Sequence, residues 1–143
     1  MNMEIKLSEL RSIKEAGKDE YWLQDLIFKS PVCLGLGELD AIAKEKQQSS
    51  GGRLDILLED PEDGSRYEVE IMLGETDETH IIRTIEYWAR ERRKFPLKQH
   101  YAVIVAAQIN RRFFEVLYLI RVQIPIIASK PSLKQTKGVI APG

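Results

Sequence analysis

Two stretches in which apolar and polar residues alternate constrain the fold of this chain more than any other feature. They span residues 51–58 and 66–74, and the segment between them is rich in Pro, Asp and Gly. Such a pattern predicts an antiparallel β-hairpin. Because neighbouring side chains of a strand point to opposite faces, Asp55 lies on the face opposite Leu54 and Ile56. The hairpin is therefore expected to bury one face and to carry carboxylates on the other.

The pairing register of the hairpin follows from its apolar faces, since a slip of one residue would turn one strand over. With the turn centred between residues 62 and 63, the predicted pairs are Leu57–Glu68, Asp55–Glu70 and Arg53–Met72. Like charges that face each other across a ladder are destabilising. The Asp55–Glu70 pair is therefore either splayed into water or gathered round a cation. A solvated strand face explains Asp55, Glu68 and Glu70 without any metal.

The composition limits the classes of protein that can carry this hairpin. At 143 residues and 43% hydrophobic, the chain suits a single globular domain with a core over about residues 19–128 and a loose tail over 129–143. The formal net charge of −1 excludes a strongly basic protein, so that any nucleic-acid surface must be a local patch. The single cysteine, Cys33, excludes an internal disulfide framework and is expected to be a small core residue. With no cleavable signal and no apolar run of transmembrane length, the expected location is the cytoplasm, with no membrane partner.

The order of the expected elements predicts an α/β fold. Helices are expected from Asp19 to Ser30-Pro31, from Thr76 or Asp77 to about Lys94, and over 110–120. Beside the hairpin, strands are expected over 39–45, 101–107 and 124–128. The continuous apolar run of 101–107 is typical of a strand buried on both faces, and Pro125 puts the last strand near a sheet edge. We therefore expect a mixed central β-sheet flanked by helices, in the order α-β-β-β-α-β-α-β.

Each helix is expected to bury one stripe of apolar side chains. In the first helix the stripe is Tyr21, Trp22, Leu26 and Phe28 or Ile27; in the second it is Ile81, Ile82, Ile85, Trp88 and Ala89; in the third it is Phe113, Phe114, Val116, Leu117 and Ile120. The second helix ends in a cluster of cations, Arg90, Arg92, Arg93 and Lys94, which complement the helix dipole. This cluster is either a solvated helix end or a track for phosphate groups.

Several short motifs resemble the PD-(D/E)xK nuclease-like superfamily. They are Glu20 on the first helix, Gly52-Arg53-Leu54-Asp55 entering a strand, Glu68-Val69-Glu70-Ile71, and Leu73-Gly74. The Ile-rich helix that follows is similar to that of small bacterial proteins in the superfamily. The resemblance spans roughly residues 20–128. It implies a restriction-endonuclease-like core and a nuclease that acts on DNA or another nucleic acid, and it is compatible with a homodimer.

The resemblance also assigns roles to individual residues. It matches Asp55 to the superfamily's metal-binding aspartate, Glu70 to its second acidic ligand and the carbonyl of Ile71 to a third ligand. Glu20 matches the acidic residue on the first helix that often completes the site. Carboxylates and a carbonyl suit Mg²⁺ or Mn²⁺, which prefer hard oxygen ligands. Such an ion would polarise a scissile phosphate and would offset the repulsion between the two acids.

At residue 72 the sequence departs from the pattern of the superfamily, which usually has lysine two residues after the second acid. Met72 can neither orient an attacking water nor lower its pKa, although some relatives have glutamine there instead of lysine. The predicted register puts Arg53 beside Met72. Because arginine stays protonated, Arg53 cannot be a general base, and its catalytic role would be electrostatic.

Three classes of function stay open at this point. The first is a Mg²⁺-dependent nuclease acting on DNA, with Asp55, Glu70 and Glu20 around the ion. The second is a nuclease-like fold that has lost hydrolysis and serves in nucleic-acid binding or assembly. The third is an unrelated domain that binds a small ligand or a protein. Met72 separates the first class from the second, and the three acids separate both from the third.

Overall fold

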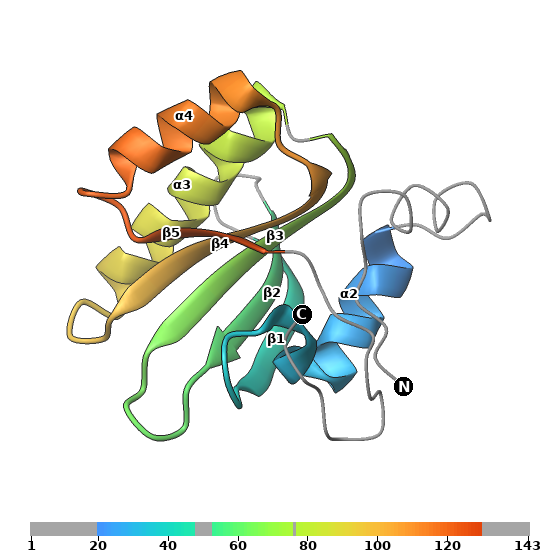
Figure 1. The fold of residues 1–143 in the computed structure, drawn as a ribbon. Coiled ribbons are helices and arrows are strands. Elements are labelled where there is room, and N and C mark those ends of the chain that lie inside the picture. Colours follow the sequence, from blue (N-terminus) through green and yellow to red (C-terminus); the bar gives the residue numbers. More distant parts are fainter. Residues whose placement is uncertain (1–19, 48–52, 76, 130–143) are drawn as a thin grey trace.

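The computed structural model describes residues 20–47, 53–75 and 77–129 of the chain (Figure 1). Its elements are, in order, helix α2 (Glu20–Lys29), the short 3₁₀ helix η1 (Pro31–Leu34), strands β1 (Asp40–Gln47), β2 (Arg53–Glu59) and β3 (Arg66–Glu75), helix α3 (Glu78–Lys94), strand β4 (His100–Gln108), helix α4 (Arg111–Ile120) and strand β5 (Ile126–Ser129). This order confirms the predicted α/β class. The predicted helix start at Asp19 and the tail over 130–143 lie outside the described residues. Within the described ranges, no helix is long and apolar enough to span a membrane.

The five strands form one mixed sheet in the order β1-β2-β3-β4-β5. β1, β2 and β3 pair antiparallel, whereas β3, β4 and β5 pair parallel. The parallel pairs need crossover connections, which α3 and α4 provide. β4 is thus an inner strand and β5 an edge strand, as the apolar run and Pro125 predicted. Figure 1 shows α3 and α4 together on one face of the sheet and α2 on the other.

The hairpin of β2 and β3 has the predicted register, because Leu57 pairs with Glu68. The turn between the strands contains Gly64 at φ 78°, in the left-handed region that glycine adopts without strain. The two predicted pairs nearer the open end of the hairpin involve Asp55 and Arg53. The side chains of both residues lie outside the described ones, so these pairs stay predictions.

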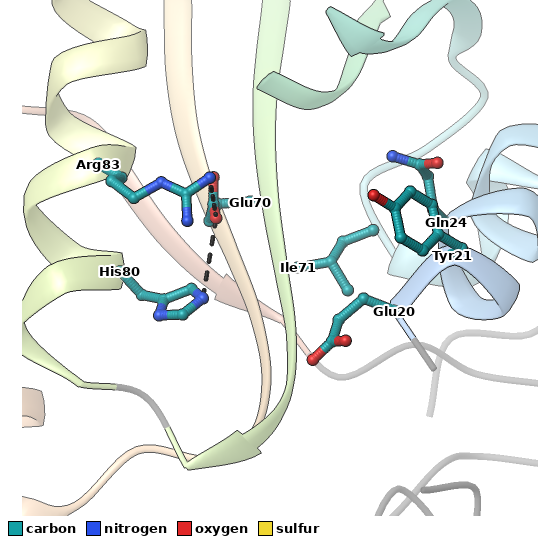
Figure 2. A pocket seen from close by; sticks show the side chains of 7 residues that line it. All are labelled: Glu20, Tyr21, Gln24, Glu70, Ile71, His80 and Arg83. Carbon is teal, nitrogen blue, oxygen red and sulfur yellow. Dashed lines mark ion pairs between the residues drawn. The ribbon is translucent and has the colours of Figure 1, made fainter. Parts of the chain in front are cut away.

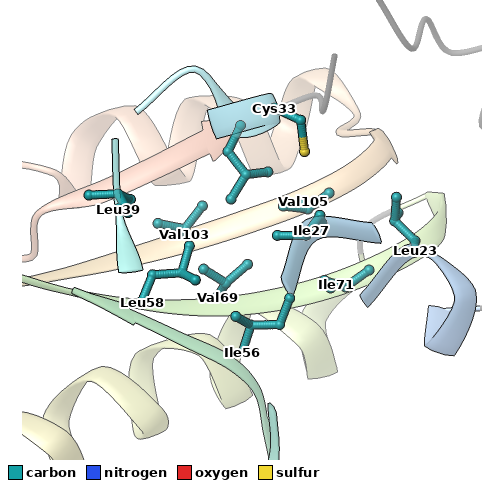
Figure 3. Packing of buried hydrophobic residues seen from close by; sticks show 11 residues of the cluster. Leu23, Ile27, Cys33, Leu39, Ile56, Leu58, Val69, Ile71, Val103 and Val105 are labelled. Atoms are coloured by element: carbon teal, nitrogen blue, oxygen red, sulfur yellow. The ribbon is translucent and has the colours of Figure 1, made fainter. Parts of the chain in front are cut away.

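The main apolar core lies between α2 and the sheet (Figure 3). It joins α2, η1 and three strands through the buried residues Leu23, Ile27, Cys33, Leu34, Leu39, Ile56, Leu58, Val69, Ile71, Val103 and Val105. Alternate residues of the two strands contribute, Ile56 and Leu58 from β2 and Val69 and Ile71 from β3, which is the pattern that the alternating sequence predicted. Cys33 is buried within this cluster, as expected. A smaller cluster of Ile81, Ile104, Ala106 and Leu117 holds α3 and α4 on the opposite face.

The helices bury stripes that differ in part from the predicted ones. The buried residues are Leu23, Gln24 and Ile27 in α2, Ile81, Thr84, Tyr87, Trp88 and Glu91 in α3, and Leu117 in α4. The prediction was wrong for Tyr21, Ile82, Phe114 and Val116, whose exposed fractions are 48%, 58%, 53% and 44%. In α3 the stripe is rotated toward polar residues, because the face of β3 beneath this helix carries carboxylates.

The carboxylates of Glu68 and Glu70 are buried, with exposed fractions of 1% and 2%. Their interpretation as a solvated strand face is therefore wrong. Glu68 Oε2 lies 3.1 Å from Nδ1 of His100, and Nε2 of the same ring lies 2.9 Å from the carbonyl oxygen of Phe95. Because a carbonyl can only accept, Nε2–H donates to Phe95, and the other ring nitrogen faces the carboxyl group of Glu68. Trp88 Nε1 donates to the His100 carbonyl at 3.0 Å, so that α3 is tied to β4 at the same point.

This buried pair predicts a large loss of stability when the ring is removed. In a His100→Leu variant, Glu68 keeps its carboxylate in the interior without the imidazole. The free energy of unfolding, measured by urea denaturation, should fall by about 3 kcal/mol. Glu68→Gln keeps a hydrogen-bonding group beside the ring and should cost only about 1 kcal/mol. Equal losses in the two variants would contradict a specific pair.

Candidate functional site

A polar pocket of about 270 Å³ lies where α2 and the first turns of α3 approach β3. Its lining residues come from three elements far apart in the chain: Glu20, Tyr21 and Gln24 of α2, Glu70 and Ile71 of β3, and His80 and Arg83 of α3. Figure 2 shows Glu70, His80 and Arg83 to one side of β3, and Ile71, Glu20, Tyr21 and Gln24 to the other. This division follows from the alternation along β3, which directs Glu70 toward α3 and Ile71 toward α2.

Glu70 is the buried acid of the pocket. Its Oε2 lies 3.6 Å from Nη2 of Arg83 and 3.9 Å from Nε2 of His80. Burying a carboxylate is costly unless charged or hydrogen-bonding groups compensate for the lost water. Two nitrogen-bearing side chains from one helix provide that compensation here. The position of α3 and the burial of the Glu70 side chain therefore depend on each other.

His80 is oriented by the residue that caps its own helix. The Asp77 carboxylate accepts a hydrogen bond from the backbone N–H of His80 at 2.9 Å, and its Oδ1 lies 2.9 Å from Nδ1 of the His80 ring. The hydrogen bond from the ring, followed by that from the backbone N–H, lowers the pKa of Asp77 below its usual value. With Nδ1 directed at Asp77, the other ring nitrogen points toward Glu70 and the pocket.

Arg83 connects the buried acid with solvent. One of its terminal nitrogens donates to the hydroxyl of Tyr87 at 3.1 Å, and its guanidinium carbon lies 5.8 Å from the centre of the Tyr87 ring. Its side chain is 33% exposed. Arginine in this setting presents a fork of donors that suits phosphate as well as carboxylate.

The structure brings three of the sequence-predicted site residues together, since Glu20, Glu70 and Ile71 line the same pocket. The side chains of Asp55 and Arg53 are outside the described residues, and their roles stay predictions. Met72 is half-buried on β3, where it pairs with Ala106 of β4. Within the described ranges, no three His, Cys, Asp or Glu side chains are arranged as a metal cluster.

Sequence reasoning missed His80 and Arg83 as residues of the site. The available signal was their spacing of three, which puts both on one side of a helix. That helix starts just after the strand of Glu70 and is capped by Asp77. An acidic strand followed at once by a capped helix brings the first turns of the helix back over the strand.

A second feature of α3 is a row of cations that starts at the pocket. Arg83, Arg90 and Lys94 are spaced by seven and four residues, so they lie along one side of the helix. Tyr87 lies between the first two, and the Arg90 guanidinium is 5.7 Å from its ring centre. Tyr87 also packs against Leu57 of β2, so the row lies on the margin of α3 that faces the antiparallel half of the sheet.

The fold is similar to that of a repair endonuclease of known structure. A repair endonuclease from Pyrococcus abyssi has a TM-score of 0.66 and 18% identity, over 79% of this chain and 46% of that one. EndoMS in a complex with double-stranded DNA gives the same score and identity over 79% and 45%, and apo EndoMS gives 0.64 and 17% over 87% and 47%. This chain thus spans less than half the length of these proteins. At such identity the likeness establishes the fold. No family model and no curated protein matches the sequence.

The side chains that line the pocket include the oxygen donors that a hard divalent cation prefers. Glu20 and Glu70 offer carboxylate oxygens, and Ile71, whose carbonyl the sequence resemblance assigns as a ligand, lines the same pocket. Arg83 disfavours metal binding, because a guanidinium 3.6 Å from Glu70 Oε2 competes with any other cation for that carboxylate. We therefore expect metal binding to require movement of Arg83 away from Glu70.

This competition can be measured without any enzymatic assay. Arg83→Gln removes the competing charge and should tighten Mn²⁺ binding by about fivefold or more, since unit charges at this distance interact by about 1 kcal/mol even in water. Isothermal titration calorimetry measures the affinity. Arg93→Gln removes the same charge from an exposed position of α3 and should leave the affinity unchanged. Weaker binding in Arg83→Gln would show that Arg83 does not compete with the ion.

Proposed function

We propose that this domain is a nuclease-like module that binds DNA and hydrolyses phosphodiester bonds with Mg²⁺ or Mn²⁺. The observation that carries the proposal is the convergence of Glu20, Glu70 and Ile71 on one pocket. It gains support from a fold shared with repair endonucleases, one of which is known in a complex with double-stranded DNA. The expected location is the cytoplasm.

In this proposal the ion would be held by Glu70, the Ile71 carbonyl and Asp55, with Glu20 completing the site. The ion would supply Lewis-acid chemistry at a scissile phosphate and a more acidic bound water. His80, directed by Asp77, borders the position of Glu70 and limits the orientations of its carboxylate. Arg83 lines the same pocket and would contact a phosphate oxygen once it leaves Glu70.

The DNA backbone would run from the pocket along the row of Arg83, Arg90 and Lys94. Arg90 is about 10 Å from Arg83 along the helix axis and Lys94 about 6 Å farther, at a rise of about 1.5 Å per residue. The shorter separation suits neighbouring phosphates of one strand, and the longer one falls between one and two phosphate steps, which the long arginine side chains can bridge. A local row of this kind reconciles nucleic-acid binding with a net charge of −1 for the whole chain.

A second candidate function is DNA binding without hydrolysis. Met72 favours it, because the side chain of methionine has no charge and no proton to donate to the reacting groups. The contact between Arg83 and Glu70 also favours it, since it satisfies the buried acid without a metal. Arg53 would then be a phosphate contact and not a residue that stabilises a transition state.

Substitution of Met72 by lysine distinguishes the two functions. Position 72 shares the strand face of Glu70, so an ammonium there can reach a water beside the ion. Met72→Lys should raise Mg²⁺-dependent cleavage of labelled single- or double-stranded DNA by about a hundredfold. Adding Asp55→Ala in the same chain should abolish this gain.

Met72→Leu is the control for packing, and it should bind the ion and DNA like the parent. A Met72→Lys variant that folds, binds Mn²⁺ in calorimetry and cuts no DNA would overturn the hydrolytic proposal. The domain would then be a DNA-binding module. Circular dichroism establishes that each variant is folded before the assay.

The proposed DNA path predicts a dependence on particular cations of α3. The double variant Arg90→Gln/Lys94→Gln should weaken DNA binding by about tenfold. It should also make the salt dependence of the affinity less steep, by the amount expected when about two phosphate contacts are lost. Fluorescence anisotropy over a range of salt concentrations measures both quantities. Arg92→Gln/Arg93→Gln removes the same charge outside the row and should have a smaller effect. Equal losses would indicate only a diffuse electrostatic attraction.

A further inference from the structure

The outer side of α4 carries more exposed apolar surface than its sequence predicted. The exposed fractions of Phe114, Tyr118, Leu119 and Val122 are 53%, 54%, 72% and 76%. A shallow groove of about 390 Å³, lined by Phe114, Glu115, Tyr118 and Leu119, follows the same side. Contiguous apolar patches of this kind on a protein surface usually mark an interaction site.

The exposed residues form a regular helical stripe. Phe114, Tyr118 and Val122 are spaced by four residues, which aligns them along one side of the helix. The stripe continues past the end of α4, because the N–H of Ile124 donates to the carbonyl of Ile120 at 2.9 Å. The inner side of α4 is already occupied, since Leu117 packs against α3 and β4 in the smaller core cluster.

We propose that this stripe is the interface through which two copies of the chain pair, with the two α4 helices antiparallel across a twofold axis at Tyr118. Antiparallel pairing about residue 118 brings together positions whose numbers add to 236. Phe114 then meets Val122 of the partner subunit, and each Tyr118 meets its own copy. The apolar stripe is therefore complementary to itself, as a twofold interface requires.

The charged residues beside the stripe favour a second copy of the chain in this antiparallel orientation. The same rule puts Glu115 at the height of Arg121 of the partner subunit, across the seam between the two helices, and by symmetry this arrangement occurs twice. A parallel arrangement would instead put Glu115 against Glu115 and Arg121 against Arg121, which is repulsive. Glu115 and Arg121 can take part in this interface in addition to, or in place of, their contacts within one chain. Arg111 and Glu115 form an i,i+4 pair at 3.6 Å that is 93% and 67% exposed, and such pairs are weak. Arg121 lies over the Tyr118 ring at 3.7 Å, already on the stripe.

The small size of the patch favours a weak dimer. A single helix of ten residues offers less area than the roughly 800 Å² per partner of a standard specific interface. We therefore expect a dimer with a dissociation constant in the micromolar range. This association involves neither the pocket nor the row of cations, so it is independent of the proposed nuclease function.

Sedimentation velocity from about 1 to 500 µM, without DNA or metal, tests the proposal on the full chain. The parent should move from monomer to dimer over this range. Tyr118→Glu puts two like charges at the axis and should weaken the dimer at least tenfold. Leu97 is fully exposed on the turn after α3 and supplies the matched control, because Leu97→Glu should leave the dimer unchanged. A parent that stays monomeric at 500 µM would overturn the proposal.

Charge reversal tests the orientation of the two helices. Glu115→Arg and Arg121→Glu should each weaken the dimer severalfold, and the double variant Glu115→Arg/Arg121→Glu should restore it. Failure of the double variant to recover would overturn the antiparallel pairing even if the parent dimerises. Tyr118→Cys gives a further readout at the axis. Under oxidising conditions it should form a disulfide-linked dimer, whereas Leu97→Cys should not. Equal crosslinking of the two variants would contradict an axis at Tyr118.

Discussion

The burial of two carboxylates beneath α3 is the constraint on which the rest of this structure depends. Glu68 and Glu70 follow each other on one face of β3, and both are almost fully buried. An apolar helix could not cover this face, because a buried carboxylate needs a charged or hydrogen-bonding partner. α3 and the strand after it meet the requirement with His100 for Glu68, and with His80 and Arg83 for Glu70. The polar side of the sheet thereby determines which side of α3 faces inward.

The candidate site arises from the same constraint. Glu70 is buried by α3 on one face, while Ile71, its neighbour on β3, faces α2 in the apolar core. α2 brings Glu20 toward the same end of the strand, so that groups from both faces of the sheet line one pocket. The apolar layer packs α2 against the sheet, and the polar layer determines what surrounds the acid. The guanidinium of Arg83 near Glu70 is therefore part of the fold even without a metal or a phosphate.

The sequence predicted the features of this protein that depend on alternation and on chain breaks. The order of elements, the hairpin register at Leu57 and Glu68, the inner position of β4 and the end of α2 before Ser30 all follow from such local patterns. The buried sides of the helices were harder to predict, because they depend on what lies across the interface. Ile82 is exposed while Thr84 is buried, since the sheet opposite α3 is polar. Phe114 is exposed because α4 lies at the margin of the sheet, where one stripe is enough to cover β4 and β5. The roles of His80 and Arg83 required knowledge of how α3 returns over β3.

The junction of antiparallel and parallel pairing at β3 has a consequence for the order of folding. β1, β2 and β3 are consecutive in the chain, so they can pair with little loss of loop entropy, whereas β4 and β5 must wait for a helical crossover. We therefore expect the three-stranded meander to form early, with Glu68 and Glu70 still in water. Docking of α3 and β4 then dehydrates both acids in one late step. Pulsed hydrogen exchange should detect this order as earlier protection of the amides of β2 than of those of β4, and simultaneous protection would exclude it.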